Sequence, residues 1–385
     1  MNERHYLFIH PLLATDETCA GYRCDLLPGT DAAPLLAELT ADPNWAKFPL
    51  QALWLAPAIP LCDNQPRLTP VFVAPPEAEA DCQRLALLRQ AGRKTVLALQ
   101  PGQPLPGAGN WDYLLLRCGH ARTLPPLSLL GLSARSTLIA SEVCSHADRD
   151  WVQKNGFTLC SCEYLLTRSA NGNRADTVRT RLLRLLALIA EDASTGELEA
   201  VFRQEPKLSY SLLRLVNSAA VAPRVPIASF GQAINLLGRR QLQRWLQLLV
   251  YADPDNGQRA NPLLIKAAAR GHLIETLSRD LELPAELEHP QDAAFMVGSF
   301  SLLDVLLNRP LPEILEQLPL ATPVRAALAE QQGTLGKLLA AIQHAESGEL
   351  EQAENLLGTL GIEPGGHLAA QLATLHWAGS IQLSA

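Results

Sequence analysis

The sequence predicts two domains, an α/β domain of barrel type followed by an all-α domain. In the first part of the chain, short apolar runs of strand character alternate with stretches of helical spacing, which is typical of βα units. Further along, the strands disappear and apolar residues recur only at helical spacing. The chain of 385 residues is also longer than one ordinary hydrophobic core requires. We therefore expect a first domain over residues 1–170, a linker over 171–177 and a second domain over 178–385.

Seven strands are expected in the first domain, with helices between several of them over Glu77–Ala91 and His146–Asn155. Prolines gather in other connections, where we expect helices to be shortened or replaced by loops. This pattern predicts a degenerate TIM-like barrel and argues against a complete eightfold one. The expected strands are Tyr6–Ile9, Ala52–Leu55, Thr69–Val73, Thr95–Leu99, Tyr113–Leu116, Thr137–Ala140 and Phe157–Cys160.

The polar segment around Asn171-Gly172-Asn173 reads as the linker, because these residues favour a turn. After it, eight segments have helical periodicity, and they define an all-α domain. They are Val178–Glu191, Thr195–Arg203, Pro206–Ala219, Ser229–Leu237, Arg239–Tyr251, Pro262–Leu281, Gln291–Leu307 and Leu335–Glu346.

Net charge, apolar runs and the positions of the cysteines limit the classes of protein to which the chain can belong. The net charge of −7 argues against a surface built to hold nucleic acid. No apolar run reaches the roughly 18–20 residues of a membrane span, and the N-terminal residues make a poor signal peptide, so we expect a cytoplasmic protein. All eight cysteines lie in the first 162 residues, and in that compartment we expect free thiols.

Two ordered motifs identify the second domain by resemblance. Residues 204–219 read Q-E-P-K-L-S-Y-S-L-L-R-L-V-N-S-A, and residues 227–238 read I-A-S-F-G-Q-A-I-N-L-L-G. They closely resemble the HDOD signature, which has an acidic residue before proline, an L-x-x-x-N-S-A helix end and an I-x-S-x-x-x-A-I-x-x-L-G segment. Residues 294–307 also resemble the HDOD part of proteins in which an EAL domain precedes an HDOD domain.

Five residues of this signature are interpreted as structural. Asn217 and Ser218 are expected to end a helix and to bond backbone groups of the following turn, with the lining of a ligand groove as the alternative. Ser229 is expected to cap the next helix and Gly238 to end it. Trp245 is expected to anchor the core.

HDOD domains resemble metal-dependent HD phosphohydrolases that have lost the metal site. Where the frame A-F-x-x-G-x-x-H-D of those enzymes places His-Asp, this chain has Ser301-Leu302. Neither side chain can replace an imidazole or a carboxylate as a metal ligand. His272 and Asp304 are close in sequence and keep a rebuilt site open as an alternative reading.

The first domain resembles EAL domains, the partner in that fusion class, by the order of short segments. Ligands of the two metal ions in a cyclic di-GMP phosphodiesterase are nevertheless replaced here, so the resemblance implies no catalytic residues and no enzyme. The segments that carry the resemblance are 9–12, 21–22, 72–74, 112–117, 138–143 and 156–157. The replacements are Arg23 (or Asp25) for the Glu of E-A-L, Ala74 for Asn, Leu115 and Arg117 for Lys and Asp, and Ser141 and Cys144 for the next Glu pair.

Three expected strands end in pairs of soft ligands, and strand ends meet at the mouth of a βα-barrel. These thiols and imidazoles suit zinc, although packing of small cysteines in the barrel core is the favoured reading and no resident cofactor is expected. The six residues are Cys118, His120, Cys144, His146, Cys160 and Cys162.

The resemblance predicts a non-catalytic regulatory protein of bacterial signal transduction that acts through protein–protein interaction. An unidentified signalling protein is its expected partner, and a homodimer is one form it can take. One alternative is a sensor that binds cyclic di-GMP or another nucleotide without cleaving it, with Arg23 and Arg117 pairing with phosphates. The last alternative is a metal-dependent phosphohydrolase with a rebuilt site.

Overall fold

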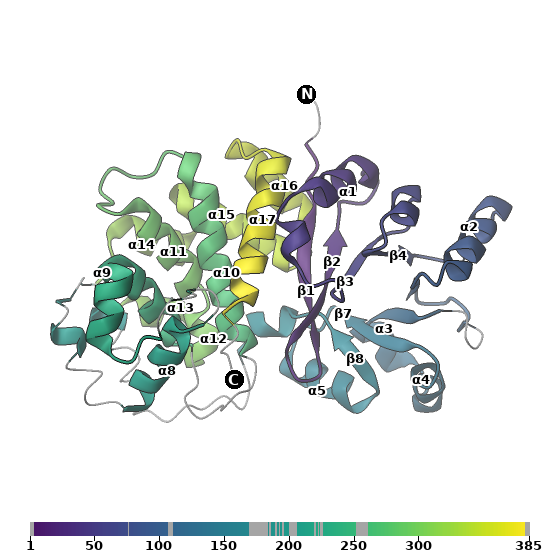
Figure 1. Ribbon diagram of the computed structural model, residues 1–385, viewed down its shortest axis with the longest axis horizontal. Helices are drawn as coiled ribbons and strands as arrows, with labels where there is room; N and C mark the ends of the chain where they lie inside the picture. The colour runs from purple at the N-terminus through teal and green to yellow at the C-terminus, as the bar shows by residue number, and fades with distance from the viewer. Residues whose placement is uncertain are drawn as a thin grey trace. The chain divides into compact units, whose positions relative to one another are not determined.

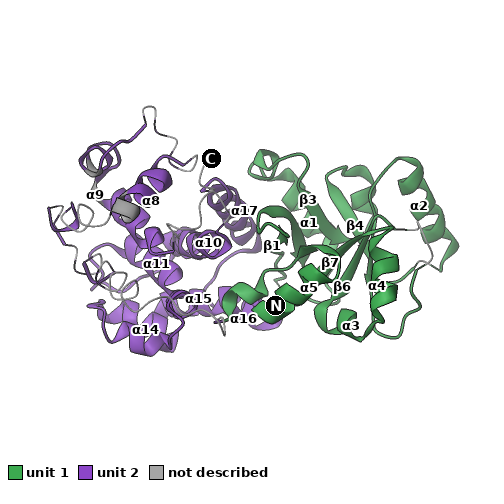
Figure 2. Cartoon of the chain, turned by 90° about the horizontal axis from the view of Figure 1, so that it is seen from below, with its two compact units in different colours: residues 1–167 green, residues 168–385 purple. Residues whose placement is uncertain are grey.

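The computed structural model describes residues 4–75, 77–106, 111–168, 206–218, 226–251 and 261–381, and also 184, 186–188, 191, 193–194, 196–199, 221 and 223. Backbone contacts divide the chain into two compact units, residues 1–167 and 168–385 (Figure 2). The expected linker, residues 171–177, and most of the first two helices expected after it lie outside the described residues.

The first unit is a closed barrel of eight strands that follow one another in sequence order (Figure 1). β1 runs antiparallel to both of its neighbours, β2 and β8, and all other neighbouring strands are parallel. The strands are β1 (Phe8–Ala14), β2 (Cys19–Asp25), β3 (Leu53–Pro57), β4 (Leu68–Phe72), β5 (Val96–Leu99), β6 (Tyr113–Arg117), β7 (Thr137–Ser141) and β8 (Phe157–Cys160).

The predicted TIM-like barrel is confirmed, but it has eight strands rather than the seven expected, because β2 was not expected. Its sequence C-A-G-Y-R-C-D has neither β-branched residues nor a continuous apolar run. Gly21 lies in its middle, where a Cβ atom would meet the carbonyl oxygen of Leu53 at 2.4 Å. The residue that weakens the strand pattern is therefore the one that allows β2 and β3 to approach.

Two apolar layers stabilise the barrel. The inner layer comes from strand residues alone, among them Leu12, Leu55 and Ile139. The outer layer joins the opposite strand faces to the surrounding helices, because successive strand residues point to opposite sides. The helices of this unit are α1 (Ala32–Ala41), α2 (Glu79–Gln90), α3 (Cys118–Thr123), α4 (Pro126–Ser133) and α5 (His146–Lys154), with short 3₁₀ helices η1 (Trp45–Lys47), η2 (Pro60–Asn64) and η3 (Glu163–Leu166).

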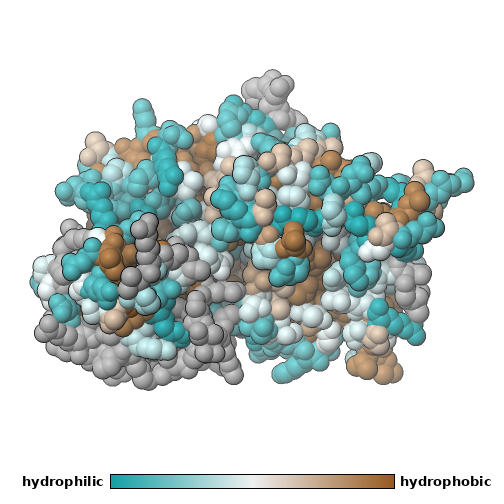
Figure 3. All heavy atoms as spheres, viewed as in Figure 1, coloured by the Kyte–Doolittle hydropathy of each residue, from teal (hydrophilic) through white to brown (hydrophobic). Residues whose placement is uncertain are grey.

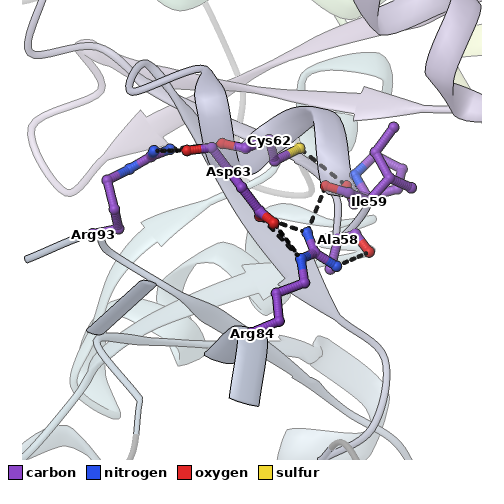
Figure 4. A network of polar contacts seen from close by, with 7 residues as sticks. Ala58, Ile59, Cys62, Asp63, Arg84 and Arg93 are labelled. Carbon is purple, nitrogen blue, oxygen red and sulfur yellow. Dashed lines mark hydrogen bonds and ion pairs between the residues drawn. The ribbon is translucent and has the colours of Figure 1, made fainter. Parts of the chain in front are cut away.

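The β3–β4 connection shows how a helix expected in a regular barrel is replaced. It contains only η2, which two arginines hold in place (Figure 4). Arg84 of α2 forms a two-nitrogen ion pair with Asp63 at 2.7 and 2.8 Å and also donates to two backbone carbonyls. Arg93 donates to four carbonyl oxygens of residues 62–68. Guanidinium groups thus satisfy backbone acceptors that a helix would have satisfied internally.

The second unit is helical throughout its described residues, as predicted. α10 packs against α11, α15 and α17, and Figure 1 shows these helices side by side. Its helices are α8 (Pro206–Val216), α9 (Phe230–Leu249), α10 (Pro262–Leu277), α11 (Pro290–Phe300), α12 (Leu303–Leu307), α13 (Leu311–Leu315), α14 (Thr322–Glu330), α15 (Gly333–Glu346), α16 (Leu350–Thr359) and α17 (Pro364–Gly379), with the 3₁₀ helix η4 (Ser278–Asp280).

Glycines allow α10 and α11 to lie in close contact. A Cβ atom on Gly298 would lie 2.5 Å from the backbone of Arg270 and 2.6 Å from the Cα atom of Gly271. A Cβ atom on Gly271 would meet Phe295 at 3.0 Å. The crossing therefore depends on two small residues that face each other.

No helix in these described stretches is both long and apolar enough to cross a bilayer.

Candidate functional sites of the two units

The mouth of the barrel carries polar side chains from the strand ends, and they pair with one another. Arg23 of β2 lies 2.7 Å from the carboxylate of Asp25, and His10 of the neighbouring strand lies 3.7 Å from the same carboxylate. Burial opposes the charge of Arg23, but Asp25 and Glu163 more than offset that effect and raise its pKa. The expected phosphate ligand Arg23 is thus already neutralised by its neighbours.

Arg117, the second expected phosphate ligand, is in a different environment. It ends β6 and forms an ion pair of 3.3 Å with Glu142, and more than half of each side chain is exposed. Exposed pairs of this kind contribute little stability, so the guanidinium of Arg117 can exchange its partner.

The six residues considered for zinc do not converge. Cys118, Cys160 and Cys162 are buried in the outer apolar layer of the barrel, between strands and helices. Cys144 is exposed, and burial raises the pKa of Cys160 to about 12. Within the part of the chain that the structure describes, no three His, Cys, Asp or Glu side chains are placed to hold a metal ion. All eight cysteines are thiols.

The two histidines of that set belong to short helices. His120 lies in α3, and His146 opens α5, where its Nε2 lies 3.3 Å from the carbonyl oxygen of Thr167. α3 begins directly at Cys118, so the chain turns away from the strand direction that the zinc hypothesis required.

The two polar residues at the end of α8 differ in their hydrogen bonds to the backbone. Asn217 donates to the carbonyl oxygen of Leu213 at 2.7 Å and to that of Ile227 at 2.8 Å, and it accepts from the N–H of Ile227 at 2.7 Å. The hydroxyl of Ser218 is buried and has no hydrogen-bond partner among the described residues, in contrast to the sequence-based expectation.

The next helix begins and bends as predicted. Ser229 accepts from the N–H of Gln232 at 3.2 Å, while the Gln232 side chain accepts from Ala228, which forms a reciprocal cap. Gly238 has a φ of 73° and breaks α9 into two parts. Trp245 is 5% exposed and lies 6.1 Å from Trp377, centroid to centroid, so it belongs to the core.

A buried ion network occupies the place where an HD enzyme has His-Asp. The hydroxyl of Ser301 accepts from Arg270 at 2.8 Å. Arg270 and Lys266 both pair with Glu346, at 2.5 and 2.9 Å. Burial alone would raise the pKa of Glu346, but the two cations lower it to about 2. The carboxylate is therefore held ionised by cations of the chain itself.

A separate cavity of about 320 Å³ opens in the helical unit, and neither Asn217 nor Ser218, the residues considered for a ligand groove, lines it. Aromatic side chains from four helices converge on it, together with charged side chains from α9, α10 and η4. It is lined by Val221, Leu237, Gln241, Arg244, Trp245, Leu248, His272, Glu275, Arg279, Phe295 and Trp377.

The aromatic wall is ordered by stacking. His272 lies parallel to Trp377, with 4.6 Å between ring centroids and 22° between planes. Phe295 meets Trp377 edge-on at 6.4 Å. His272 Nδ1 lies 2.8 Å from the hydroxyl of Thr374, which fixes the orientation of the imidazole.

The charged side of the cavity combines two arginines with one buried carboxylate. Arg244 pairs with Glu275 at 2.8 Å and with Asp292 at 2.9 Å. Burial, together with Arg279 and Arg244, lowers the pKa of His272 to about 4, so the imidazole is neutral near pH 7. This arrangement can accept a ligand that has both an aromatic ring and hydrogen-bonding groups.

Comparison with known proteins identifies the helical unit. Residues 176–318 match the family described as the HDOD domain. Over 141 residues the chain is 36% identical to the cyclic di-GMP phosphodiesterase CdgJ of Vibrio cholerae, which covers 37% of this chain and 32% of the relative. Over 172 residues it is 31% identical to the uncharacterized protein YuxH of Bacillus subtilis, which covers 44% of this chain and 41% of the relative.

Among solved structures, the crystal structure of the EAL-like domain protein YdiV matches 41% of this chain and 89% of its own, with 12% identity and a TM-score of 0.34. A barrel followed by an HDOD domain is the order expected of an EAL–HDOD protein.

The first of these relatives corrects one expectation. The prediction that the chain is not an enzyme, made from its replaced metal ligands, is overturned because that relative is named a phosphodiesterase. The chain spans about a third to two fifths of the length of these curated relatives.

Proposed function

We propose that this chain, whose residues 176–318 are an HDOD domain, is a bacterial regulatory protein of cyclic di-GMP signalling that acts through protein–protein interaction. The name of the Vibrio relative supports the signalling system. The interaction itself is supported by an apolar surface on the barrel unit.

The observation that carries this proposal is the outer face of α4. Leu127 is 85% exposed and Leu130 is 70% exposed, whereas Leu129 and Leu132 of the same helix are buried against the barrel. Surface helices normally place polar residues on the side that faces solvent. Figure 3 shows this hydrophobic patch at the position of α4, at the lower right. Exposed apolar surface of this kind is typical of protein interaction sites.

The test changes the patch without touching the core. The purified full chain and a Leu127→Asp/Leu130→Asp variant are used as bait in lysate of the source bacterium, and bound proteins are quantified by mass spectrometry. Leu50→Asp is the matched control, because Leu50 is 80% exposed and lies outside α4. We expect the double variant alone to lose a specific partner by about tenfold or more. Equal recovery by all three proteins would refute the role of α4.

A second candidate function is nucleotide sensing at the barrel mouth, and the exposed Arg117 favours it. Its partner Glu142 is equally exposed, so a phosphate can replace that carboxylate at low cost. Calorimetric titration with cyclic di-GMP tests this reading. Binding that weakens about tenfold in Arg117→Ala, and not in the exposed control Arg135→Ala, supports it, and no binding to the unmodified protein excludes it.

The same samples allow a direct assay of cyclic di-GMP hydrolysis, the activity in the name of the Vibrio relative. Regulation through α4 predicts that the double variant loses its partner while any hydrolysis rate stays unchanged.

A further inference from the structure

We propose that the cavity of the helical unit binds a guanine nucleotide, with the base against the aromatic wall and the phosphate at Arg279. This inference goes beyond the proposed function, because it concerns a small-molecule site in the second unit and needs no partner protein. It is also separate from the barrel mouth and from the Ser301 network, neither of which contributes a residue to the cavity lining.

The shape of the site indicates a planar aromatic ligand. Trp245, Phe295 and Trp377 come from α9, α11 and α17, and they line a volume of about 320 Å³, at the lower end of the usual range for ligand sites. Stacking of a base on such side chains is a main source of affinity in nucleic-acid and nucleotide sites.

The polar groups of the wall indicate which base fits. Glu275 is only 5% exposed, yet it lines the cavity, where its carboxylate can accept hydrogen bonds. The Watson–Crick edge of guanine presents two adjacent N–H donors, N1–H and the 2-amino group, which match a carboxylate. Adenine presents an acceptor nitrogen beside its amino group, and a carboxylate repels that acceptor.

Arg244 holds this carboxylate in place inside the cavity and partly offsets the rise in pKa that burial imposes on Glu275. Its guanidinium pairs with Glu275 and lies over the ring of Phe295, with 5.7 Å from Cζ to the ring centroid. The acceptor for the base is thus held in place before the ligand arrives, which reduces the cost of binding.

Arg279 is the phosphate ligand that the site offers. It lies on η4 at the rim of the cavity, its side chain is exposed, and it forms no ion pair with any of the described residues. A guanidinium at the edge of an aromatic pocket is suited to a phosphate, because its N–H groups can contact two oxygens at once.

The experiment titrates the purified full chain with GMP by calorimetry, with AMP and ribose 5-phosphate as comparison ligands. We expect GMP to bind, AMP to bind at least tenfold more weakly, and ribose 5-phosphate to show no measurable binding. Arg279→Ala should weaken GMP binding about tenfold, as expected for loss of a charge-assisted contact. Arg309→Ala is the matched control, because Arg309 is an exposed arginine outside the cavity, paired with Glu313 at 3.0 Å.

A second pair of variants tests the aromatic wall. Trp377→Leu should weaken GMP binding about tenfold, and Trp377→Phe should restore it to within about threefold, because only phenylalanine keeps an aromatic face. Circular dichroism confirms that each variant is folded. If Trp377→Leu fails to fold, the Arg279 pair and the comparison ligands still decide the question.

Three results would overturn the proposal: no GMP binding at millimolar concentration, equal binding of ribose 5-phosphate or AMP, or GMP binding unaffected by Arg279→Ala. The Leu127→Asp/Leu130→Asp variant should bind GMP normally. Loss of the partner with retained GMP binding, or the reverse, therefore distinguishes failure of this inference from failure of the proposed function.

Discussion

Asn217 holds both backbone groups of Ile227 with one side chain, donating to the carbonyl oxygen at 2.8 Å and accepting from the N–H at 2.7 Å. The end of α8 is thereby fastened to the segment that leads into α9. This contact is the physical reason for an asparagine at the end of the L-x-x-x-N-S-A motif, since few other side chains offer a donor and an acceptor side by side.

The first prediction compares the two neighbouring polar residues of that motif. Asn217→Ala removes three hydrogen bonds and leaves two groups of Ile227 without their partner, so the free energy of unfolding should fall by about 2 kcal/mol. Ser218→Ala should change it by less than about 0.5 kcal/mol, because the buried Ser218 hydroxyl has no partner among the described residues. Urea unfolding measures the free energy of unfolding of both variants. Equal losses of stability in the two would contradict the role given to Asn217.

The second prediction concerns the helix crossing of α10 and α11. Gly298→Ala places a methyl group within 2.5 Å of the Arg270 backbone, so the helices must separate and stability should fall by about 2–3 kcal/mol or more. Gly366→Ala is the control, because that glycine lies within α17 with open space around it. There alanine should stabilise the helix by up to about 1 kcal/mol. Thermal unfolding of the two variants should therefore shift in opposite directions.

The third prediction is a pH dependence from the ion network. The pKa of Glu346 is lowered to about 2 in the folded protein from an ordinary value of 4.5. The folded state therefore binds fewer protons than the unfolded state between these values, so this stabilisation is complete above about pH 5 and is lost as pH falls towards 2. Glu346→Gln should cost about 3 kcal/mol at pH 7, since it leaves Arg270 and Lys266 buried without the carboxylate.

The difference in the free energy of unfolding between Glu346→Gln and the unmodified protein should shrink as the pH falls from 5 to 2. Glu313→Gln, at an exposed pair with Arg309, should have little effect at any pH. A difference that stays constant down to pH 2 would show that Glu346 does not have a lowered pKa.

The fourth prediction concerns His272 and a different pH window. Its pKa is lowered to about 4, first by burial and then by Arg279 and Arg244. The unfolded chain binds a proton at this site below about pH 6.5, while the folded chain does not until about pH 4, so folding loses stability as pH falls through this range. His272→Phe should lessen that loss by about 2 kcal/mol at pH 5. Guanidinium unfolding of the unmodified protein and of His272→Phe at pH 7.5 and pH 5 tests this prediction. An equal fall in the free energy of unfolding of both proteins would exclude His272 as the source of the pH dependence.

Local features of the fold were predictable because their causes are local. Ser229 and Gly238 fix the start and the break of α9 through a side-chain cap and a positive φ, and both effects are visible in a few consecutive residues. β2 was not predicted because Gly21 is required by the close approach of β3, a strand that is distant in sequence. The residues next to Gly21 do not indicate this contact.

The sites depended on contacts between distant segments, and these could be predicted only in part. The absence of His-Asp at residues 301–302 could be recognised in the sequence. The ion pair of Arg270 with Glu346 could not be predicted, because the two residues are distant in sequence. Cys118 and Cys160 both lie in the outer apolar layer and not at the mouth. Cys118 already belongs to α3, and a shift of one position along β8 reverses the face to which the Cys160 side chain points. A ligand groove was considered only at Asn217 and Ser218, and the residues that line the cavity were not predicted, since they span positions 221–377.

The pairing of β1 with β8 has a consequence for how the barrel forms. Leu13 pairs with Cys160 and Ala14 with Leu159, so the first strand obtains its second neighbour only after the last one has been made. During synthesis on the ribosome, the outer edge of β1 stays unpaired until β8 has been made. Contacts this distant in sequence also slow folding. Any nascent chain that stops before Phe157 exposes two unpaired strand edges. Such truncated products are the species that should aggregate and require chaperones.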